Sequence, residues 1–347
     1  MEITLGCCTS EERVDFIEFQ KLGTIAAIKV LSLRLHRKYL AKILSSVSDE
    51  LNLMKEMKYK KIMKKYVSRG NFVFYAQSIS TATIISLEIL SSLAFSGEME
   101  NNNSLSNDSS TNKIIIERGF PVRTKCLFMN VSTSSYLTIS FVQSIQLIST
   151  AFGNVGMDIF FFNLSMLVCG QLEILYEEIS QFEGTIDVKE TKLKIIELIK
   201  RHQLLWEEAQ FLEKTFNLMI LMQLVVNITG ICSYGIQCLA NMQIYGLLGG
   251  IKSIFASELL MVQLFLYSFA GENLSSRIMK LSFAIYQISW YNLPKKLSQD
   301  LYFILMITEK PFTLTAGKMF PMNMKTFSSI LKATFSFFSL LRLMYHV

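Results

Sequence analysis

The side chains best placed to carry chemistry form a polar stripe on the last apolar segment of the chain, 326–345. Polar residues recur there every three to four positions, as on one face of an α-helix: Lys325, Ser328, Ser329, Lys332, Ser336 and Ser339. In lipid, such a stripe is expected to face protein or water. The two interpretations are an ion pathway and packing between helices, where serine is common.

Catalytic and metal chemistry find no support in the sequence. The three histidines, His36, His202 and His346, are far apart, and neither they nor the six cysteines show metal-ligand spacing. No glycine motif that cradles phosphate is present, and Gly249-Gly250 is expected to permit close helix packing. The sequence therefore predicts no enzyme activity, no cofactor and no metal.

The elements that must position these residues are apolar runs long enough to cross a bilayer. Of the 347 residues, 51% are hydrophobic. A helix crosses the roughly 30 Å hydrocarbon core with about 20 residues and satisfies its own backbone groups in lipid. Candidate spans are 71–95, 136–168, 215–239, 247–270 and 326–345, with a weaker one at 14–35. We expect an all-α, polytopic membrane protein that forms one domain over 1–347.

Charge and glycosylation signals orient these spans. The segment 29–69 is rich in Lys and Arg, which is typical of the cytoplasmic side. The loop 96–134 carries N-x-[ST] acceptors that favour the extracellular or lumenal side, at Asn102, Asn107 and Asn130. Alternation places 271–323 in the cytoplasm and the C-terminus outside. This orientation disfavours a G-protein-coupled receptor, whose C-terminal tail is cytoplasmic. The net charge of +6 follows this distribution, so no nucleic-acid partner is expected.

Charged residues and prolines within or beside the spans limit the remaining classes. Glu88, Asp158 and Glu258 lie in apolar runs and are expected to face the bundle interior, Asp158 in a structural role. All four prolines fall outside the spans. A secondary transporter with broken helices is therefore disfavoured.

An ordered set of short motifs in 286–347 resembles the C-terminal signature of the insect odorant receptors. The motifs are Trp290-Tyr291 with Leu293-Pro294, Gln299-Asp300-Leu301, Lys310-Pro311, the predicted turn Leu314-Thr315-Ala316-Gly317, and Phe327-Ser328-Ser329-Ile330-Leu331-Lys332. The resemblance runs from about Leu22 to Val347. It implies an inverted seven-helix topology, whose first helix has no counterpart in this chain, with a pore-lining last helix and a cytoplasmic anchor of helices over 271–323.

The resemblance also implies three groups of site residues. An apolar odorant pocket among the outer helix ends would contain Ser86, Leu87, Leu90, Phe141, Ser144, Ile145, Ile148, Ile251 and Phe255. A pore with an apolar gate that closes by dewetting would involve Ser336, Leu340, Leu343 and Met344. An anchor between subunits would use Trp290, Leu293, Leu297, Leu301 and Ile304.

The function implied by this resemblance is that of an odorant receptor subunit in the plasma membrane of olfactory sensory neurons. It would bind small volatile ligands, contact membrane lipid, and assemble with a common co-receptor subunit into a hetero-tetrameric, non-selective cation channel. Two alternatives stay open: a gustatory-type chemoreceptor channel, which shares the architecture, and a truncated, nonfunctional paralogue.

Overall fold

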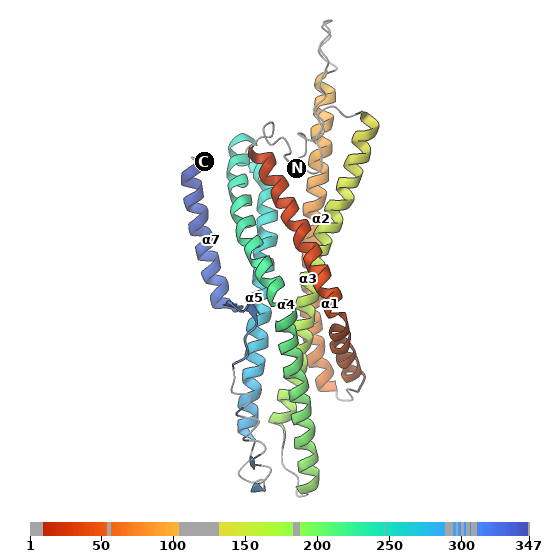
Figure 1. Ribbon diagram of the computed structural model, residues 1–347, viewed down its shortest axis with the longest axis vertical. Coiled ribbons are helices and arrows are strands. Elements are labelled where there is room, and N and C mark those ends of the chain that lie inside the picture. The colour runs from red at the N-terminus through yellow and green to blue at the C-terminus, as the bar shows by residue number, and fades with distance from the viewer. Residues whose placement is uncertain are drawn as a thin grey trace.

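The chain forms an elongated bundle of long helices (Figure 1). The computed structural model describes residues 10–53, 57–103, 132–182, 188–245, 247–288 and 311–345, with single positions between 294 and 306. Its helices are α1 (Ser10–Leu53), α2 (Met57–Asn103), α3 (Thr133–Ser180), α4 (Val188–Tyr245), α5 (Leu247–Gln287) and α7 (Met324–Tyr345). We call the end of the bundle with the carboxyl ends of α2 and α7 the outer end, and the opposite end the inner end.

Four helices are long and apolar enough to cross a membrane. These segments are Met57–Leu90, Thr133–Ser180, Lys189–Gln243 and Gly250–Gln287. The weak candidate span 14–35 lies within α1, which continues to Leu53, and the candidate 326–345 lies within α7. α1 is not among these four helices, because charged side chains interrupt its apolar run.

The helices extend well beyond the expected spans. α4 has 58 residues, which corresponds to roughly 87 Å at 1.5 Å per residue, far more than a bilayer core requires. The expected loop 96–134 is also shorter, because α2 continues to Asn103 and α3 begins at Thr133. Ser132 caps α3 by accepting a hydrogen bond from the Ser135 backbone N–H at 3.3 Å.

The all-α fold class is confirmed, with one local correction. The segment 271–323, expected to be helical, contains a two-stranded antiparallel hairpin of β1 (Thr315–Ala316) and β2 (Phe320–Pro321). Its turn places Gly317 at φ 59° and Lys318 at φ 60°. Both residues are left-handed, as in the type I′ turns that fit the twist of short hairpins.

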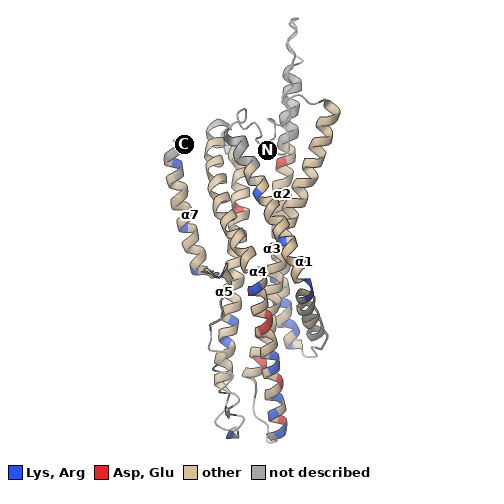
Figure 2. Ribbon diagram, in the orientation of Figure 1, with Lys and Arg blue, Asp and Glu red and all other residues tan. Residues whose placement is uncertain are grey.

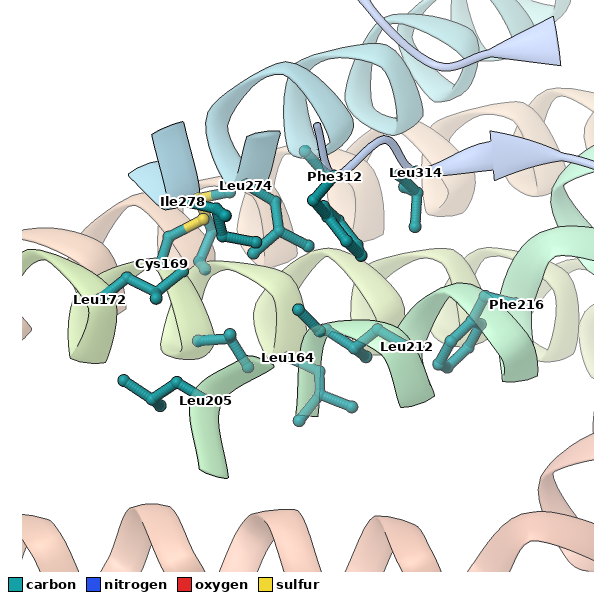
Figure 3. Packing of buried hydrophobic residues seen from close by; sticks show 14 of the residues in the cluster. Leu164, Cys169, Leu172, Leu205, Leu212, Phe216, Leu274, Ile278, Phe312 and Leu314 are labelled. Carbon is teal, nitrogen blue, oxygen red and sulfur yellow. The ribbon is translucent and has the colours of Figure 1, made fainter. Parts of the chain in front are cut away.

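The hydrophobic core lies where α3, α4 and α5 pack together toward the inner half of the bundle. Figure 3 shows Leu164 and Leu172 of α3, Leu212 of α4 and Leu274 of α5 converging in this cluster. Phe312, from the segment before β1, closes one side of it. The segment that leads to α7 is thus part of the core, so α7 is joined to the bundle by a packed connection.

The inner end of α3 holds its neighbours through carboxylates. Glu173 forms an ion pair with Arg277 of α5 and accepts a hydrogen bond from the Tyr66 hydroxyl of α2 at 3.3 Å. Glu177 pairs with Lys58 of α2 at 2.7 Å, and Glu178 pairs with Arg201 of α4 at 2.5 Å. These contacts fix the helix register at the inner end. The pair of Lys58 and Glu177 is the most exposed of the three, and such a pair adds at most about 1 kcal/mol.

A buried ion pair joins α1, α3 and α5. Lys29 Nζ lies 2.5 Å from Asp158 Oδ1, and both side chains are almost fully buried, at 1% and 4% exposure. The Tyr267 hydroxyl donates a hydrogen bond to the same carboxylate. Lys29 also reaches the Asn154 backbone oxygen at 3.5 Å, and the Asn154 side chain donates to the Leu22 backbone oxygen at 2.8 Å. Asp158 therefore joins three helices from a buried position, which is consistent with the structural role expected for it.

We predict that Lys29→Met lowers the thermal stability of the purified protein in detergent. The substitution leaves the buried Asp158 carboxylate without its counter-charge, which costs roughly 3–5 kcal/mol. The double variant Lys29→Met/Asp158→Asn should recover most of the lost Tm, because the amide still accepts from Tyr267. Lys38→Met, at an exposed position of the same helix, serves as control. An unchanged Tm for Lys29→Met would contradict this role.

Candidate functional site

The last helix, α7, starts from a defined cap. Asn323 accepts a hydrogen bond from the Thr326 backbone N–H at 2.8 Å through its side chain, which makes it the N-cap residue. The Met322 backbone N–H donates to the Leu314 oxygen at 2.8 Å, so the hairpin runs directly into this cap. From there α7 runs beside only the outer half of α4 and α5 (Figure 1).

One face of α7 packs against the bundle. Phe327 stacks edge-to-face on Phe265 of α5, with ring centroids 5.7 Å apart. Thr334 is buried, and its backbone oxygen accepts from the Cys232 thiol of α4 at 3.9 Å. Phe338 lies so close to Gly235 that a Cβ there would meet its ring at 2.8 Å. The glycine therefore allows the close approach of α4 and α7.

The opposite face of α7 carries the polar stripe. At 100° per residue, the positions roughly opposite Phe327, Thr334 and Phe338 are Lys325, Ser329, Lys332, Ser336 and Ser339, all of them exposed. Ser328, the sixth residue of the predicted stripe, is exposed on the flank of this face, because it follows Phe327 directly. Near the outer end the same face becomes apolar, with Leu340 54% and Leu343 74% exposed. Phe335 and Phe337 flank the stripe and are each 52% exposed. The side chain of Met344 lies outside the described part of the structure.

The hairpin fixes the start of α7 against the middle of α4. The Gly317 backbone N–H donates to the Asn217 oxygen at 2.8 Å, and the Thr315 hydroxyl donates to Glu213 Oε1 at 2.6 Å. A Cβ at Gly317 would collide with the Leu221 side chain. The motif Leu314-Thr315-Ala316-Gly317, interpreted from the sequence as a turn, is thus the joint between the core and α7.

An ion pair joins α2 and α5 at the outer end, beside two residues of the predicted ligand pocket. Lys252 Nζ of α5 lies 2.5 Å from Glu88 Oε2 of α2. This contact places Leu87 and Ile251, the neighbours of the two charged residues, on adjoining helices. Both are partly buried.

The other predicted pocket residues line exposed surfaces of the single chain. Leu90 is 63% exposed, Phe141 67%, Ile145 49%, Ile148 40% and Phe255 38%. Ser86 is exposed, and partly buried Ser144 donates to the Ser140 backbone oxygen at 2.8 Å. Figure 1 shows that the outer end of α3 tilts away from α4 and α5.

Several predicted residues lie outside the described structure. These are the anchor residues Trp290, Leu293, Leu297, Leu301 and Ile304, and the glycosylation acceptors Asn107 and Asn130. Asn102 falls in the last turn of α2, and its side chain is not described. The anchor and glycosylation assignments therefore stay predictions.

The three acidic residues within the predicted spans were expected to face the bundle interior, and they differ in burial. Asp158 is buried, as expected, and Glu88 is partly buried. The prediction for Glu258 is wrong for the single chain: its side chain is exposed, because it shares a face of α5 with the exposed Ile254 that the described helices leave uncovered. Sequence reasoning missed the partners Lys29, Lys252 and Glu213. For Lys29 and Lys252, the one signal in the sequence was the presence of a lysine within an apolar run.

No metal centre is found in the described residues, where His, Cys, Asp and Glu do not gather in groups of three or more. The arrangement is that of a polytopic helical membrane protein whose last helix packs on the bundle by one face only, with no catalytic constellation in its described part.

Comparisons with known proteins define the family. The profile of the family described as 7tm Odorant receptor matches residues 22–335. Odorant receptor 10 of Aedes albopictus is 23% identical over 194 residues, which are 54% of this chain and 50% of that protein. Odorant receptor 13a of Drosophila melanogaster is 24% identical over 195 residues, 51% of this chain and 46% of that protein. The chain thus spans about half the length of the curated relatives it matches.

The fold comparison covers more of the molecule. The insect olfactory receptor OR5 from Machilis hrabei in complex with eugenol superposes with a TM-score of 0.74 over 98% of this chain and 83% of that chain, at 13% identity. The chain belongs to the 7tm odorant receptor family, a family of receptors and not of enzymes. This membership favours the odorant branch over the gustatory alternative.

We predict that Gly317→Ala weakens the joint between the core and α7. Alanine in the left-handed region costs roughly 1–2 kcal/mol, and its methyl group meets Leu221. The Tm of the purified protein should fall by several degrees. Gly23→Ala in α1, where a Cβ meets nothing within 4 Å, should leave the Tm unchanged or raise it. Equal melting of both variants would show that the turn geometry is not required.

Proposed function

We propose that the chain is the ligand-recognising subunit of an odorant-gated, non-selective cation channel, formed as a hetero-tetramer with a co-receptor subunit. The observation that carries this proposal is the two-faced character of α7. Its packed face contacts α4 and α5, and its polar stripe faces away from the bundle. Serines and lysines facing hydrocarbon would be costly, so the stripe requires water or protein against it.

A central pore meets this requirement. Four α7 helices around one axis would turn their stripes toward a water-filled path. Phe335 and Phe337, on the two flanks of the stripe, would pack against the neighbouring copies. Leu340 and Leu343 would then form an apolar constriction near the outer end, which excludes water when narrow. Lys332 would point into the wider part of the path, with its apolar stem along the wall.

Ligand binding is proposed at the outer ends of α2, α3 and α5. The predicted residues there are mainly apolar, which suits small volatile molecules. A ligand held between Ile145, Ile148 and Phe255 would draw the tilted end of α3 toward α5. Because α5 contacts α7 through Phe265 and Phe327, such a movement would reach the pore helix.

The proposed orientation places the inner end in the cytoplasm and the C-terminus outside. Figure 2 shows Lys and Arg gathered along the inner parts of α2, α4 and α5, whereas the outer parts are mostly uncharged. This segregation supports the cytoplasmic assignment of the inner end by the positive-inside tendency.

The direct test is odorant-evoked cation current in cells that express the chain with the co-receptor. We expect current in response to at least one member of a broad volatile panel. Leu340→Asp should abolish the odorant-dependent component, because a charged constriction no longer dewets. Leu193→Asp, at an exposed position near the start of α4, is the control and should retain it. Silence despite surface expression would contradict the proposal and favour the nonfunctional paralogue.

A further inference from the structure

A row of lysines stands near the start of α2, in the part of the helix whose positive charge supports the cytoplasmic assignment of the inner end. Lys60, Lys61, Lys64 and Lys65 are all exposed. Within the described part of the chain, none of the four forms an ion pair with an acidic side chain, in contrast to Lys58, which pairs with Glu177. The five steps from Lys60 to Lys65 cover roughly 7.5 Å along the helix axis, so four ammonium groups are concentrated within about two turns.

The lysines stand on the outward face of α2. The inward face is held by Met63 and Tyr66, which are 2% and 0% exposed. Like charges so close together repel one another, and none of the four side chains is paired with a described acidic residue. An external anion would remove the repulsion.

The same face changes character further along the helix. The positions 61, 65, 68, 72, 75 and 79 follow one another at intervals of four and three residues, which keeps them on a single stripe. Along this stripe Lys61 and Lys65 give way to Ser68, and then to three large exposed side chains. Phe72 is 74% exposed, Tyr75 63% and Ile79 66%.

This order of polarity matches one kind of partner. A phospholipid presents an anionic headgroup followed by apolar chains, in the same sequence and over a similar length. An acidic segment of a soluble protein would match the lysines but leave Phe72 and Ile79 uncovered. Lysine stems also lie along apolar surface while their ammonium groups reach the headgroup layer, and tyrosine is enriched at that boundary.

We propose that Lys60, Lys61, Lys64 and Lys65 form a binding site for a phospholipid whose headgroup carries more than one phosphate, with its acyl chains along Phe72 and Ile79. Clusters of four or more basic residues beside a span favour anionic lipids, at about 1 kcal/mol per residue. Lysine binds phosphate as a point charge, so four lysines favour a polyanionic headgroup over a singly charged one. This proposed lipid site is formed by the exposed face of α2, and it does not require that the chain be gated by an odorant.

The test uses the purified full-length chain in detergent and a fluorescent short-chain phosphatidylinositol bisphosphate, followed by anisotropy. We expect binding that is at least about tenfold tighter than for matched phosphatidylserine, and no saturable binding of phosphatidylcholine. The variant K60Q/K61Q/K64Q/K65Q should lose at least about tenfold in affinity. The corresponding four-arginine variant should retain binding, which separates loss of charge from loss of folding.

The matched control removes the same charge elsewhere. K189Q/K192Q/K194Q/K200Q acts on exposed lysines near the start of α4, which alternate with Glu190 and Glu197, and it should change affinity by less than about twofold. Equal losses in both glutamine variants would overturn the site and indicate a net-charge effect only. Competition by soluble inositol trisphosphate as strong as that of the lipid would overturn the role of Phe72 and Ile79. Because the readout is binding, its failure is distinguishable from failure of the channel proposal.

Discussion

The buried contact between Lys29 and Asp158 is the interaction on which the arrangement of the bundle depends. Neither charge is tolerable in this environment without the other, so α1 and α3 must meet at one register. The Tyr267 hydroxyl adds α5 to the same carboxylate. The apolar core of α3, α4 and α5 buries more surface, whereas the ion pair requires one specific alignment of its two residues. The contact therefore defines which turns of α1, α3 and α5 face each other.

The attachment of α7 differs from this buried contact between α1, α3 and α5. The hairpin at Gly317 joins α7 to α4 through backbone and side-chain hydrogen bonds, and the close approach at Gly235 holds its outer half. Beyond these contacts, α7 leaves most of its surface to partners. A helix that is fixed at its start and uncovered along one face can tilt about that start, so that its far end moves most. The proposed gate at Leu340 lies near that far end.

Much of this architecture was predictable from local patterns in the sequence. Apolar runs located the helices, the three-to-four residue repeat identified the stripe on α7, and Leu314-Thr315-Ala316-Gly317 indicated a turn. The pairing of Lys29 with Asp158 was not predictable, because it joins positions 129 residues apart and no local pattern records such a distance. The exposure of Glu258 was missed for a related reason: an apolar run does not say which of its faces neighbouring helices cover. The apolar run 215–239 marks only the membrane-crossing part of α4 (Val188–Tyr245), because hydropathy falls in the charged part of the helix while helical periodicity continues.

The central claim is that the exposed stripe of α7 faces an aqueous pore. Single cysteines at two neighbouring positions test it directly: Ser336, on the stripe, and Thr334, buried against α4 at 3% exposure. Both changes are close to isosteric. In channels opened by odorant, a charged methanethiosulfonate reagent should alter the current of Ser336→Cys and leave Thr334→Cys like the parent. Modification of Thr334→Cys, or an unchanged current in Ser336→Cys, would contradict a pore along this face.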